Sequence, residues 1–333
     1  MQRKIVIHIL QLIVVFTWSN ISAQQKWENV DRFFQPLPDE FHVYRTTEKL
    51  DGSPFIAYYA EAKLKDKKLD FTVDTGSNRR LTPKQFYEKD GQPLLVMNCT
   101  FFSFETNKSV NVVVKDGKMV AYNNETIVGR GKDTFTYTHP FISAIGIDKK
   151  RNADVAWLYA DPSQKYPYAS QKSLPAIKDS VKGFDFEYAL NNTSIVAGSY
   201  HGKSYLEPSL KKWKMQTAFG GGPVLLQNGE IKVTNNEERK FPGKGINDKH
   251  PRTCIGYTND GRIIMMAIEG RFPNIAEGAT LTQEAQLLKD LGCVEALNLD
   301  GGGSSCMLIN GIQTIKPSDK GIERAVPAVF IIK

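Results

Sequence analysis

Four of the Asn-Gly and Asp-Gly pairs in this 333-residue chain follow apolar runs that predict strands of hairpins, and they restrict the fold more than any other feature. Such pairs favour the positive φ angles of a type I′ turn, which joins two neighbouring antiparallel strands. We therefore predict a sheet that is rich in hairpins and mainly antiparallel. The pairs are Asp116-Gly117, Asn228-Gly229, Asp260-Gly261 and Asn310-Gly311.

Helices are predicted to be few. Residues 281–291 place leucine and alanine on one face at helical spacing, Thr280 and Gln283 form a capping-box pattern, and Gly292 suits the end of the helix. Residues 82–89 are predicted to form a second, short helix. The chain is thus assigned to the α+β class, a mainly antiparallel mixed sheet with a few packed helices. Strand signals run evenly from about residue 41 to the end, which favours a single domain over residues 24–333.

The N-terminus is predicted to be a signal peptide, residues 1–23. Arg3 and Lys4 precede an apolar stretch, residues 5–18, and small residues end at Ala23, after which cleavage is expected. No other stretch is long and apolar enough to span a bilayer. The mature chain is therefore expected to be secreted or periplasmic, with no membrane span after removal of the signal. An uncleaved N-terminal anchor is the alternative.

The net charge limits which classes of partner are expected, and the cysteines leave their pairing open. The formal charge is +7, and loss of Arg3 and Lys4 leaves about +5. No basic patch is interleaved with aromatic residues, so no nucleic-acid partner is expected, and an anionic small substrate or envelope polymer fits better. The sequence does not determine the oligomeric state.

Export permits disulfides, but the pairing is open, and buried thiols are equally compatible with the four cysteines, Cys99, Cys254, Cys293 and Cys306.

A loop of three glycines is the strongest site signal. The apolar run Val294–Leu297 reads as a buried strand, and Asn298, Leu299 and Asp300 lead from it into Gly301–Gly303, followed by two serines. Three consecutive glycines cost conformational entropy, so we expect close approach of the backbone to a bound group. A carboxylate, backbone N–H groups and two hydroxyls together suggest a binding or catalytic site. A tight turn with a solvated aspartate is the structural alternative.

Five blocks in order resemble the phosphodiester glycosidase family over residues 40–333. They are Met97–Phe102, Phe219–Leu225, His250–Gly256, Glu269–Arg271 and Thr280–Gly311. The resemblance implies hydrolysis of a sugar-1-phosphodiester, a glycosyl–phosphate linkage, such as the N-acetylglucosamine-1-phosphate type in envelope or host glycans. Cys99 and Thr100 stand where the family usually has glycines.

The resemblance and the chemistry of the residues together suggest roles. Asp300 is the main carboxylate, as nucleophile or as stabiliser of the oxocarbenium-like centre, and Glu269 is the second, as acid/base or as acceptor from a sugar hydroxyl. Arg252 is expected to hold the phosphate through its rigid fork. The residues expected to bind substrate are Asn98, His250, Gly221, Gly222, Gly301, Gly302, Gly303, Ser304 and Ser305, of which Asn98 and His250 bond either to the substrate or to residues that hold it.

Structural readings compete for several of these residues. Asp300 can cap its turn, Glu269 can pair with an arginine, and Arg252 can be structural. His250 can be a turn residue, and Asn98 can satisfy backbone groups. No metal site and no required cofactor are predicted, although Asp and Asn oxygens near a phosphate could hold Ca²⁺.

Two other functions compete with the glycosidase. The first is a carbohydrate- or envelope-binding protein on an inactive glycosidase fold, which the departures at Cys99 and Thr100 suggest. The second is an aspartic protease, suggested by Asp74-Thr75-Gly76-Ser77 after an apolar strand. Such a protease needs two carboxylates that share a proton, and the chain has no second Asp-Thr-Gly or Asp-Ser-Gly.

Overall fold

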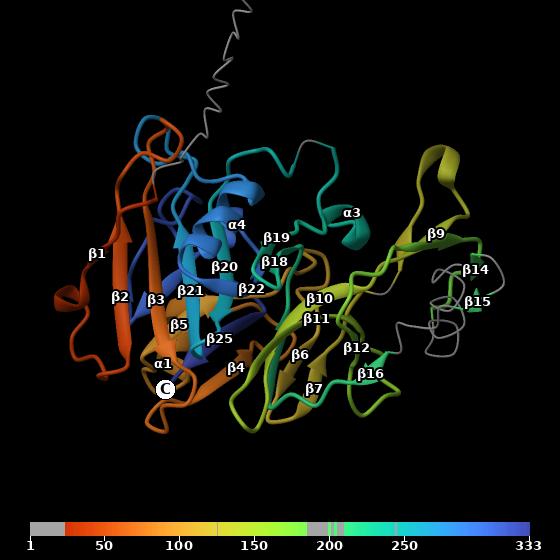
Figure 1. Cartoon of the computed structure of the whole chain (residues 1–333), viewed down its shortest axis with the longest axis horizontal. Coiled ribbons are helices and arrows are strands. Elements are labelled where there is room, and N and C mark those ends of the chain that lie inside the picture. The colour runs from red at the N-terminus through yellow and green to blue at the C-terminus, as the bar shows by residue number, and fades with distance from the viewer. Residues whose placement is uncertain (1–23, 125, 185–198, 201–202, 205–209, 244) are drawn as a thin grey trace, which may run out of the picture.

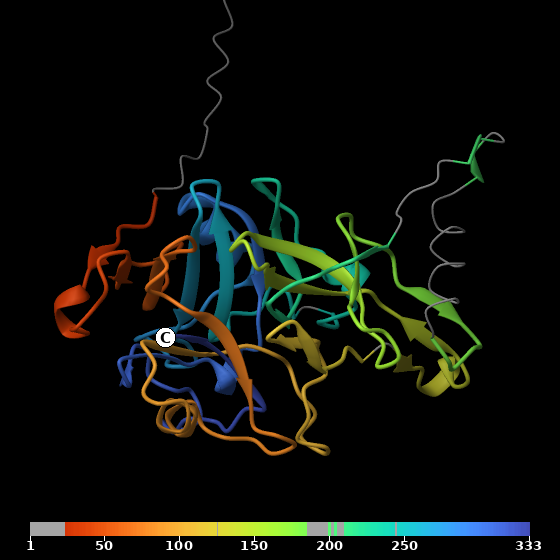
Figure 2. The same ribbon diagram turned by 90° about the horizontal axis from the view of Figure 1, so that it is seen from below.

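The computed structural model describes residues 24–124, 126–184, 199–200, 203–204, 210–243 and 245–333. The predicted signal peptide, residues 1–23, lies outside the described residues. Every strand pairing described is antiparallel, and a few helices pack on the sheets, as two perpendicular views show (Figures 1 and 2). The predicted α+β class with a mainly antiparallel sheet is confirmed.

The largest sheet has eight strands in the order β1-β2-β3-β21-β20-β22-β18-β19. Its central strands alternate their side chains between two apolar layers, so both faces are covered. The bounds are β1 (Glu28–Asn29), β2 (Phe41–Thr46), β3 (Ala57–Lys63), β18 (Val224–Gln227), β19 (Glu230–Ile231), β20 (Arg252–Thr258), β21 (Arg262–Ile268) and β22 (Cys293–Asn298).

Two further sheets have five and seven strands, in the orders β24-β23-β5-β25-β4 and β16-β12-β11-β10-β17-β6-β7. The first comprises β4 (Phe71–Thr75), β5 (Leu95–Asn98), β23 (Met307–Ile309), β24 (Ile312–Gln313) and β25 (Ala328–Ile332). The second comprises β6 (Val113–Lys115), β7 (Lys118–Ala121), β10 (Ile142–Ile147), β11 (Ala153–Tyr159), β12 (Tyr168–Ser170), β16 (Lys211–Lys212) and β17 (Thr217–Gly220).

Two small sheets complete the strands. One is formed by β8 (Ile127–Val128), β9 (Tyr137–His139) and β13 (Ile177–Asp179), and it extends to one side of the larger sheets in both views (Figures 1 and 2). The other pairs β14 (Ser199–Tyr200) with β15 (Lys203–Ser204).

Both predicted helices are present. α4 (Leu281–Asp290) begins after Thr280 with the capping box that the sequence indicated, and α1 (Pro83–Lys89) has the same arrangement of Thr82 and Gln85. The sequence did not predict the short helix α3 (Asn235–Glu238) or the 3₁₀ turns η1 (Asp31–Phe33), η2 (Gly131–Asp133) and η3 (Gly302–Ser304). No helix among the described residues is long and apolar enough to cross a membrane.

All four predicted hairpins form, joining β6 to β7, β18 to β19, β20 to β21 and β23 to β24. In three of them both residues of the Asn-Gly or Asp-Gly pair have positive φ, as a type I′ turn requires. The turn from β20 to β21 differs, because there only Gly261 has positive φ. Three residues separate these two strands, and such loops need one left-handed residue rather than two.

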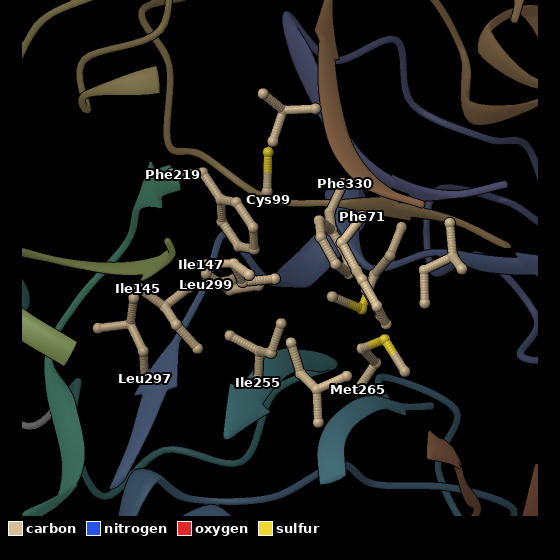
Figure 3. Close-up of a cluster of buried hydrophobic side chains, with 14 of the residues drawn as sticks. Phe71, Cys99, Ile145, Ile147, Phe219, Ile255, Met265, Leu297, Leu299 and Phe330 are labelled. Carbon is tan, nitrogen blue, oxygen red and sulfur yellow. The ribbon is translucent and has the colours of Figure 1, made fainter. Parts of the chain in front are cut away.

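The core lies between the three large sheets. One cluster combines Phe71 and Phe330 of the five-stranded sheet, Ile145 of the seven-stranded sheet, and Ile255 and Met265 of the eight-stranded sheet (Figure 3). The opposite face of the eight-stranded sheet packs its other residues against α4. The four cysteines are buried and unbonded, so the structure favours buried thiols over bridges.

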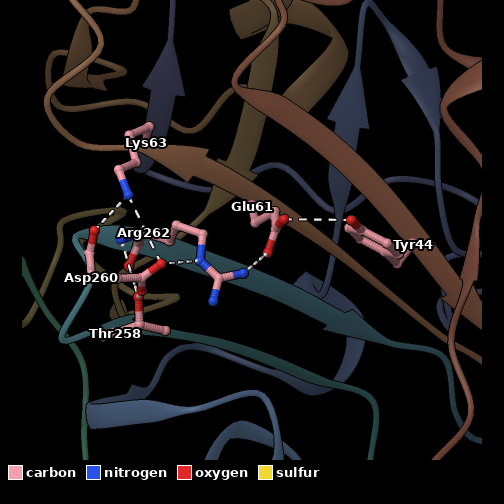
Figure 4. A network of polar contacts seen from close by, with 6 residues as sticks. All are labelled: Tyr44, Glu61, Lys63, Thr258, Asp260 and Arg262. Atoms are coloured by element: carbon pink, nitrogen blue, oxygen red, sulfur yellow. Dashed lines mark hydrogen bonds and ion pairs between the residues drawn. The ribbon is translucent and has the colours of Figure 1, made fainter.

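A polar network fixes one end of the eight-stranded sheet (Figure 4). Arg262 donates to Glu61 on β3 at 2.7 Å and to Asp260 in the turn at 3.0 Å. Tyr44 adds a hydrogen bond to Glu61 from the next strand, β2. At the opposite end of these central strands, β20 begins and β21 and β22 end.

Glu238, at the end of α3, ties three strands together. It is fully buried, and its carboxylate accepts hydrogen bonds from the backbone N–H groups of Ser143 and Val224 and from the indole of Trp157. The hydroxyls of Ser143 and Thr234 also donate to it. A single carboxylate therefore satisfies five donors that apolar surroundings would otherwise leave unpaired.

We predict that Glu238→Ala lowers the free energy of unfolding by about 3–4 kcal/mol, because buried donors lose their acceptor. Urea unfolding followed by tryptophan fluorescence measures this change. The matched control is Glu237→Ala on the same helix, which is expected to change stability by less than about 0.5 kcal/mol. Equal effects of the two substitutions would contradict the role given to Glu238.

Candidate active site

The predicted site forms where three central strands of the eight-stranded sheet reach the same edge. Arg252 at the start of β20 pairs with Ile268 at the end of β21, and Cys254 pairs with Asn298 at the end of β22. Asp300 follows β22 by two residues, and Glu269 directly follows β21. The register thus brings the His250, Glu269 and Asp300 motifs to one edge, although they are distant in sequence.

The three-glycine loop carries the chain from β22 into β23 of the five-stranded sheet. Gly302 has φ +62° and donates its N–H to the carbonyl of Pro251 at 2.8 Å. A Cβ on Gly301 would stand 2.8 Å from that carbonyl oxygen, and one on Gly303 would overlap the guanidinium of Arg324. The glycines allow close approach, but the groups that approach are parts of the chain itself, whereas the sequence predicted approach to a bound group.

Asp300 is held by its backbone. Its N–H donates to the carbonyl of Cys99 at 3.0 Å, and its carbonyl accepts from the Asn98 amide at 2.6 Å. Its side chain is partly exposed. Burial is the largest influence and raises the pKa of Asp300 to about 6, while Ser304, Arg324 and Lys240 act in the opposite direction. A carboxylate with such a pKa changes its charge close to physiological pH, which is typical of a catalytic group.

Three cationic side chains border the two glycine loops. Arg324 and Arg271 lie against Gly303 and Gly302, and a Cβ on Gly222 would stand 2.6 Å from Cε of Lys240. Among the described residues, neither Lys240 nor Arg271 has a carboxylate within ion-pair distance, whereas Arg324 pairs with Asp319 at 2.6 Å. Burial lowers the pKa of Lys240 to about 8, although Glu238 and Asp300 act against the shift. The site therefore offers uncompensated positive charge to an anion.

Buried polar atoms without partners gather in the same segments. They include the hydroxyl oxygens of Ser304 and Ser305, Oδ1 of Asn298 and Nδ1 of His250. Burying an unpaired polar atom costs about 1–3 kcal/mol, so such atoms are uncommon unless a ligand or water pairs with them. Ser305, predicted to contact the substrate, is thus available to donate, whereas Ser304 lies close enough to Asp300 to lower its pKa.

Asn98 and Arg252 instead use their polar atoms within the protein. Oδ1 of Asn98 accepts from the Thr253 hydroxyl and the Cys306 N–H, both at 2.9 Å. Arg252 is 3% exposed and donates from Nε and Nη2 to the carbonyls of Ala279 and Asp248. These contacts give both residues a positioning role, in line with the structural alternatives considered for them.

Glu269 and His250 lie farther along the same edge. Glu269 is largely buried, and its Oε2 accepts the N–H of Lys316 at 2.8 Å. No ion pair joins it to Arg252 or Arg271 in the described structure. His250 exchanges two backbone hydrogen bonds with Ala279, and burial together with Arg252 and Arg271 lowers the pKa of its imidazole. His250 is thus neutral at pH 7 and can donate or accept one hydrogen bond.

The other glycine loop, which contains Gly221 and Gly222, packs against Asn298 at the end of β22. Gly222 donates its N–H to the Asn298 carbonyl at 2.8 Å and accepts from the Asn298 amide at 2.7 Å. A Cβ on Gly221 would stand 2.4 Å from that same carbonyl oxygen. The loop thereby fixes the strand that leads to Asp300, and at Gly222 it borders Lys240.

Sequence reasoning missed Lys240 and Arg324, and it considered Arg271 only as a partner for Glu269. Lys240 follows α3, and Arg324 precedes β25, in irregular segments without a recognisable motif. Only Arg271 carried a signal, because it follows Glu269 and Gly270 in a block at a strand end. Their approach to the glycine loops depends on tertiary packing.

A cavity of about 260 Å³ adjoins the site. Its lining includes Lys240, Phe101 and Phe241, with Ile142 and Pro140 behind them. The ammonium of Lys240 lies 4.5 Å from the centre of the Phe101 ring. A mixed apolar and polar pocket beside a carboxylate suits a small organic group such as a sugar ring.

Asp74 does not adopt the arrangement of an aspartic protease. On β4, its carboxylate contacts the ammonium groups of Lys89 and Lys115, the second at 2.6 Å. These two lysines lower the pKa of Asp74 although burial opposes them, whereas burial and Asp74 raise the pKa of neighbouring Asp90. The two ammonium groups hold the Asp74 carboxylate in its ionised form, whereas the carboxylates of a protease share a proton, which disfavours the protease alternative.

Fold and site together define an α+β protein with a titratable carboxylate in a cationic pocket. The sequence profile of the phosphodiester glycosidase family matches residues 182–333. The predicted resemblance to this family is therefore confirmed over the second part of the chain. No group of three His, Cys, Asp or Glu that could hold a metal occurs among the described residues.

Individual relatives match over shorter stretches. The SPbeta prophage-derived uncharacterized protein YomE of Bacillus subtilis is 41% identical over 81 residues, 24% of this chain and 12% of that protein. The N-acetylglucosamine-1-phosphodiester α-N-acetylglucosaminidase of mouse is 31% identical over 103 residues, 28% of this chain and 20% of the enzyme. The matches thus span a fifth or less of these relatives' own length.

Solved structures share the fold over most of the chain. The catalytic domain of the zebrafish N-acetylglucosamine-1-phosphodiester α-N-acetylglucosaminidase, auto-inhibited by its pro-peptide, has a TM-score of 0.57 at 19% identity, covering 93% of this chain and 88% of that one. A hypothetical protein from Synechocystis has a TM-score of 0.56 at 15% identity, covering 88% of this chain and 62% of that one.

We predict that Asp300→Asn stabilises the folded protein at pH 7 by about 1–2 kcal/mol. The pKa of Asp300 is 3.8 before folding and about 6 afterwards, so the folded state binds more protons between these values and loses stability as the pH rises through them. The gain should vanish near pH 3.5. Thermal unfolding at both pH values, with exposed Asp70→Asn as control, measures it. A less stable Asp300→Asn protein at pH 7 would show that the carboxylate is structural.

Proposed function

We propose that this protein is a hydrolase that cleaves a sugar-1-phosphodiester at the anomeric carbon. The observation that carries the proposal is the Asp300 carboxylate, with its raised pKa, beside glycine loops that are bordered by three cations suited to a phosphate. The family match supports the same reaction. Neither a carboxylate alone nor a cationic pocket alone would indicate glycosyl–phosphate cleavage, but this linkage needs both.

The phosphate is proposed to lie over the three-glycine loop. Arg271 and Arg324 approach that loop from its own side, and Lys240 approaches from the Gly222 side. Guanidinium groups match phosphate oxygens in pairs, and the ammonium adds a point charge. As the bond to the sugar breaks, these cations stabilise the charge that the phosphate gains.

The carboxylate acts on the other side of the bond. Ionised Asp300 either attacks the anomeric carbon or stabilises its oxocarbenium-like charge. Phosphate is a good leaving group, so a strong general acid is less necessary than for an ordinary glycoside. Glu269 directly follows β21, and its Oε2 already accepts the N–H of Lys316. Its Oε1 is proposed to accept a hydrogen bond from a sugar hydroxyl or to serve as acid/base.

The finer assignments are proposals too. The cavity beside Phe101 and Lys240 would take the sugar, and the names of the vertebrate relatives suggest N-acetylglucosamine. The N-terminal sequence suggests an exported protein acting on envelope or host glycans. Three side-chain cations already supply positive charge, so Ca²⁺ is not expected to be required.

The alternative is a binding protein on an inactive glycosidase fold. Its support is Cys99 and Thr100, where the family has glycines. Both residues are fully buried, and burial raises the pKa of the Cys99 thiol. The changed side chains thus pack inside and leave the cations and Asp300 in place, which favours an active enzyme.

The deciding experiment is hydrolysis of sugar-1-phosphodiesters by purified residues 24–333, with and without a chelator. We expect release of free sugar, and Asp300→Asn should lower kcat by at least about a thousandfold because the reacting group is lost. Exposed Asp70→Asn should retain full activity. Binding of the diesters by the parent protein without sugar release would favour the binding-protein alternative.

The pH profile gives a second, independent prediction. We expect kcat/KM to rise through about pH 6 as Asp300 ionises and to fall above about pH 8 as Lys240 loses its proton. Lys240→Arg should move the alkaline fall in kcat/KM to higher pH, since a guanidinium stays charged. Lys240→Gln should remove that fall and lower kcat by about 10- to 100-fold. An unchanged alkaline limb in both variants would exclude Lys240 from phosphate binding.

A further inference from the structure

Next to the site, four side chains form a surface that the proposed reaction does not use in full. We call it the arginine–phenylalanine platform, made of Arg80, Phe102, Phe104 and Arg324. The guanidinium carbon of Arg80 lies 5.2 Å from the Phe102 ring centre and 5.1 Å from that of Phe104, and that of Arg324 lies 5.6 Å from Phe104. The two rings are 4.8 Å apart.

Three segments that are distant in sequence build the platform. Leu81 and Val326 exchange two backbone hydrogen bonds, which sets Arg80 and Arg324 near each other. The loop from β5 to β6 contributes both phenylalanines and is closed by the pair Phe102–Ser109 and by the bond from Ser103 N–H to the Lys108 carbonyl. The platform is therefore held by backbone bonds rather than by chance contacts of long side chains.

Arg80 is not neutralised within the described structure. Its Nε donates to Oδ1 of Asn107 at 2.8 Å, and no carboxylate of the described residues lies within ion-pair distance. The fork of its two Nη groups is left for a ligand. Phe104 beside it is 63% exposed, although an exposed phenyl ring gains nothing from water. A bare ring next to an unpaired guanidinium is typical of a recognition surface.

Arg324 connects the platform to the reaction site. Its Nη2 packs onto Gly303 in the loop that follows Asp300, while its guanidinium also lies over Phe104. A phosphate held at the glycine loop therefore has the sugar on its Lys240 side, where the cavity lies, and the platform on its Arg324 side. The platform faces the group that departs with the phosphate.

We infer, on the basis of the proposed function, that the platform binds a second phosphate carried by the leaving group, through Arg80. In the reaction the oxygen of water bonds to the anomeric carbon and one proton of that water passes to solvent, while the bond from the carbon to the phosphate oxygen breaks with its electron pair on the oxygen. The leaving group thus departs with two phosphates. It can be a nucleoside diphosphate or the next phosphate-linked unit of a polymer, since both present a phosphate to a guanidinium.

Three substrates test this inference: the methyl diester of N-acetylglucosamine-1-phosphate, UDP-N-acetylglucosamine, and a two-unit oligomer of an N-acetylglucosamine-1-phosphate polymer. We expect the parent protein to prefer one of the last two in kcat/KM, and the preferred one identifies the source of the second phosphate. Arg80→Gln should lower kcat/KM for that substrate about tenfold more than for the methyl diester. Arg80→Lys should restore part of the preference.

Arg79→Gln is the matched control, because it removes the same charge from the neighbouring, exposed residue and should leave all three rates unchanged. Phe104→Leu keeps the apolar bulk without the ring and should weaken the preference. Equal losses on all three substrates in Arg80→Gln, or equal effects at Arg79 and Arg80, would overturn the inference.

Product binding separates this inference from the proposed function. Calorimetry compares UDP with UMP, which differ by one phosphate. We expect UDP to bind the parent more tightly than UMP, and Arg80→Gln to lose that difference while Arg79→Gln keeps it. This result would support the platform even if no diester were hydrolysed, in which case the proposed function alone fails. Equal affinity of the parent for UDP and UMP would reject the platform.

Discussion

The buried side-chain amide of Asn98 is the contact on which the site depends. It lies at the end of β5 in the five-stranded sheet, and it joins Thr253 of the eight-stranded sheet, the Asp300 carbonyl and the Cys306 N–H. Few single side chains reach both sheets at the point where the chain crosses between them. A buried amide with all these bonds satisfied fixes one register, because any slip leaves polar atoms unpaired in apolar surroundings. The position of Asp300 follows from that register.

Much of the architecture was readable from local patterns. The four turn pairs and the capping residue Thr280 act within a few residues, so the sequence shows them directly. The glycine loop and Asp300 were found for the same reason. The sequence placed Arg252 and Asn98 in motifs that meet at this edge of the sheet, but it cannot show that their donors and acceptors are used within the protein, by backbone groups and by the Thr253 hydroxyl. Lys240 and Arg324 reach the site through tertiary packing, and no local pattern marks them.

The site combines two opposing demands on charge. Burial makes the ionised form of Asp300 costly, whereas Lys240 and Arg324 favour it, and the balance leaves a pKa near neutrality. The same burial weakens the hold of Lys240 on its proton. For both groups the charged form therefore costs free energy when no opposite charge is near. An anion bound among the cations would lower that cost for Lys240. Stability is lower here than it would be with neutral side chains, as is usual where function sets the charges.

Arg324 touches both the glycine loop and the ring of Phe104, whereas the other side chains of the proposed platform lie outside the strand ends that carry Asp300 and Glu269. The consequence concerns how such a protein diversifies. Substitutions in the loop that bears Phe104, or at Arg80, can alter which leaving groups are accepted while the strand ends that carry the carboxylate stay intact. Lineages that share this core can therefore acquire different natural substrates by remodelling one exposed loop, without rebuilding the chemistry beneath it.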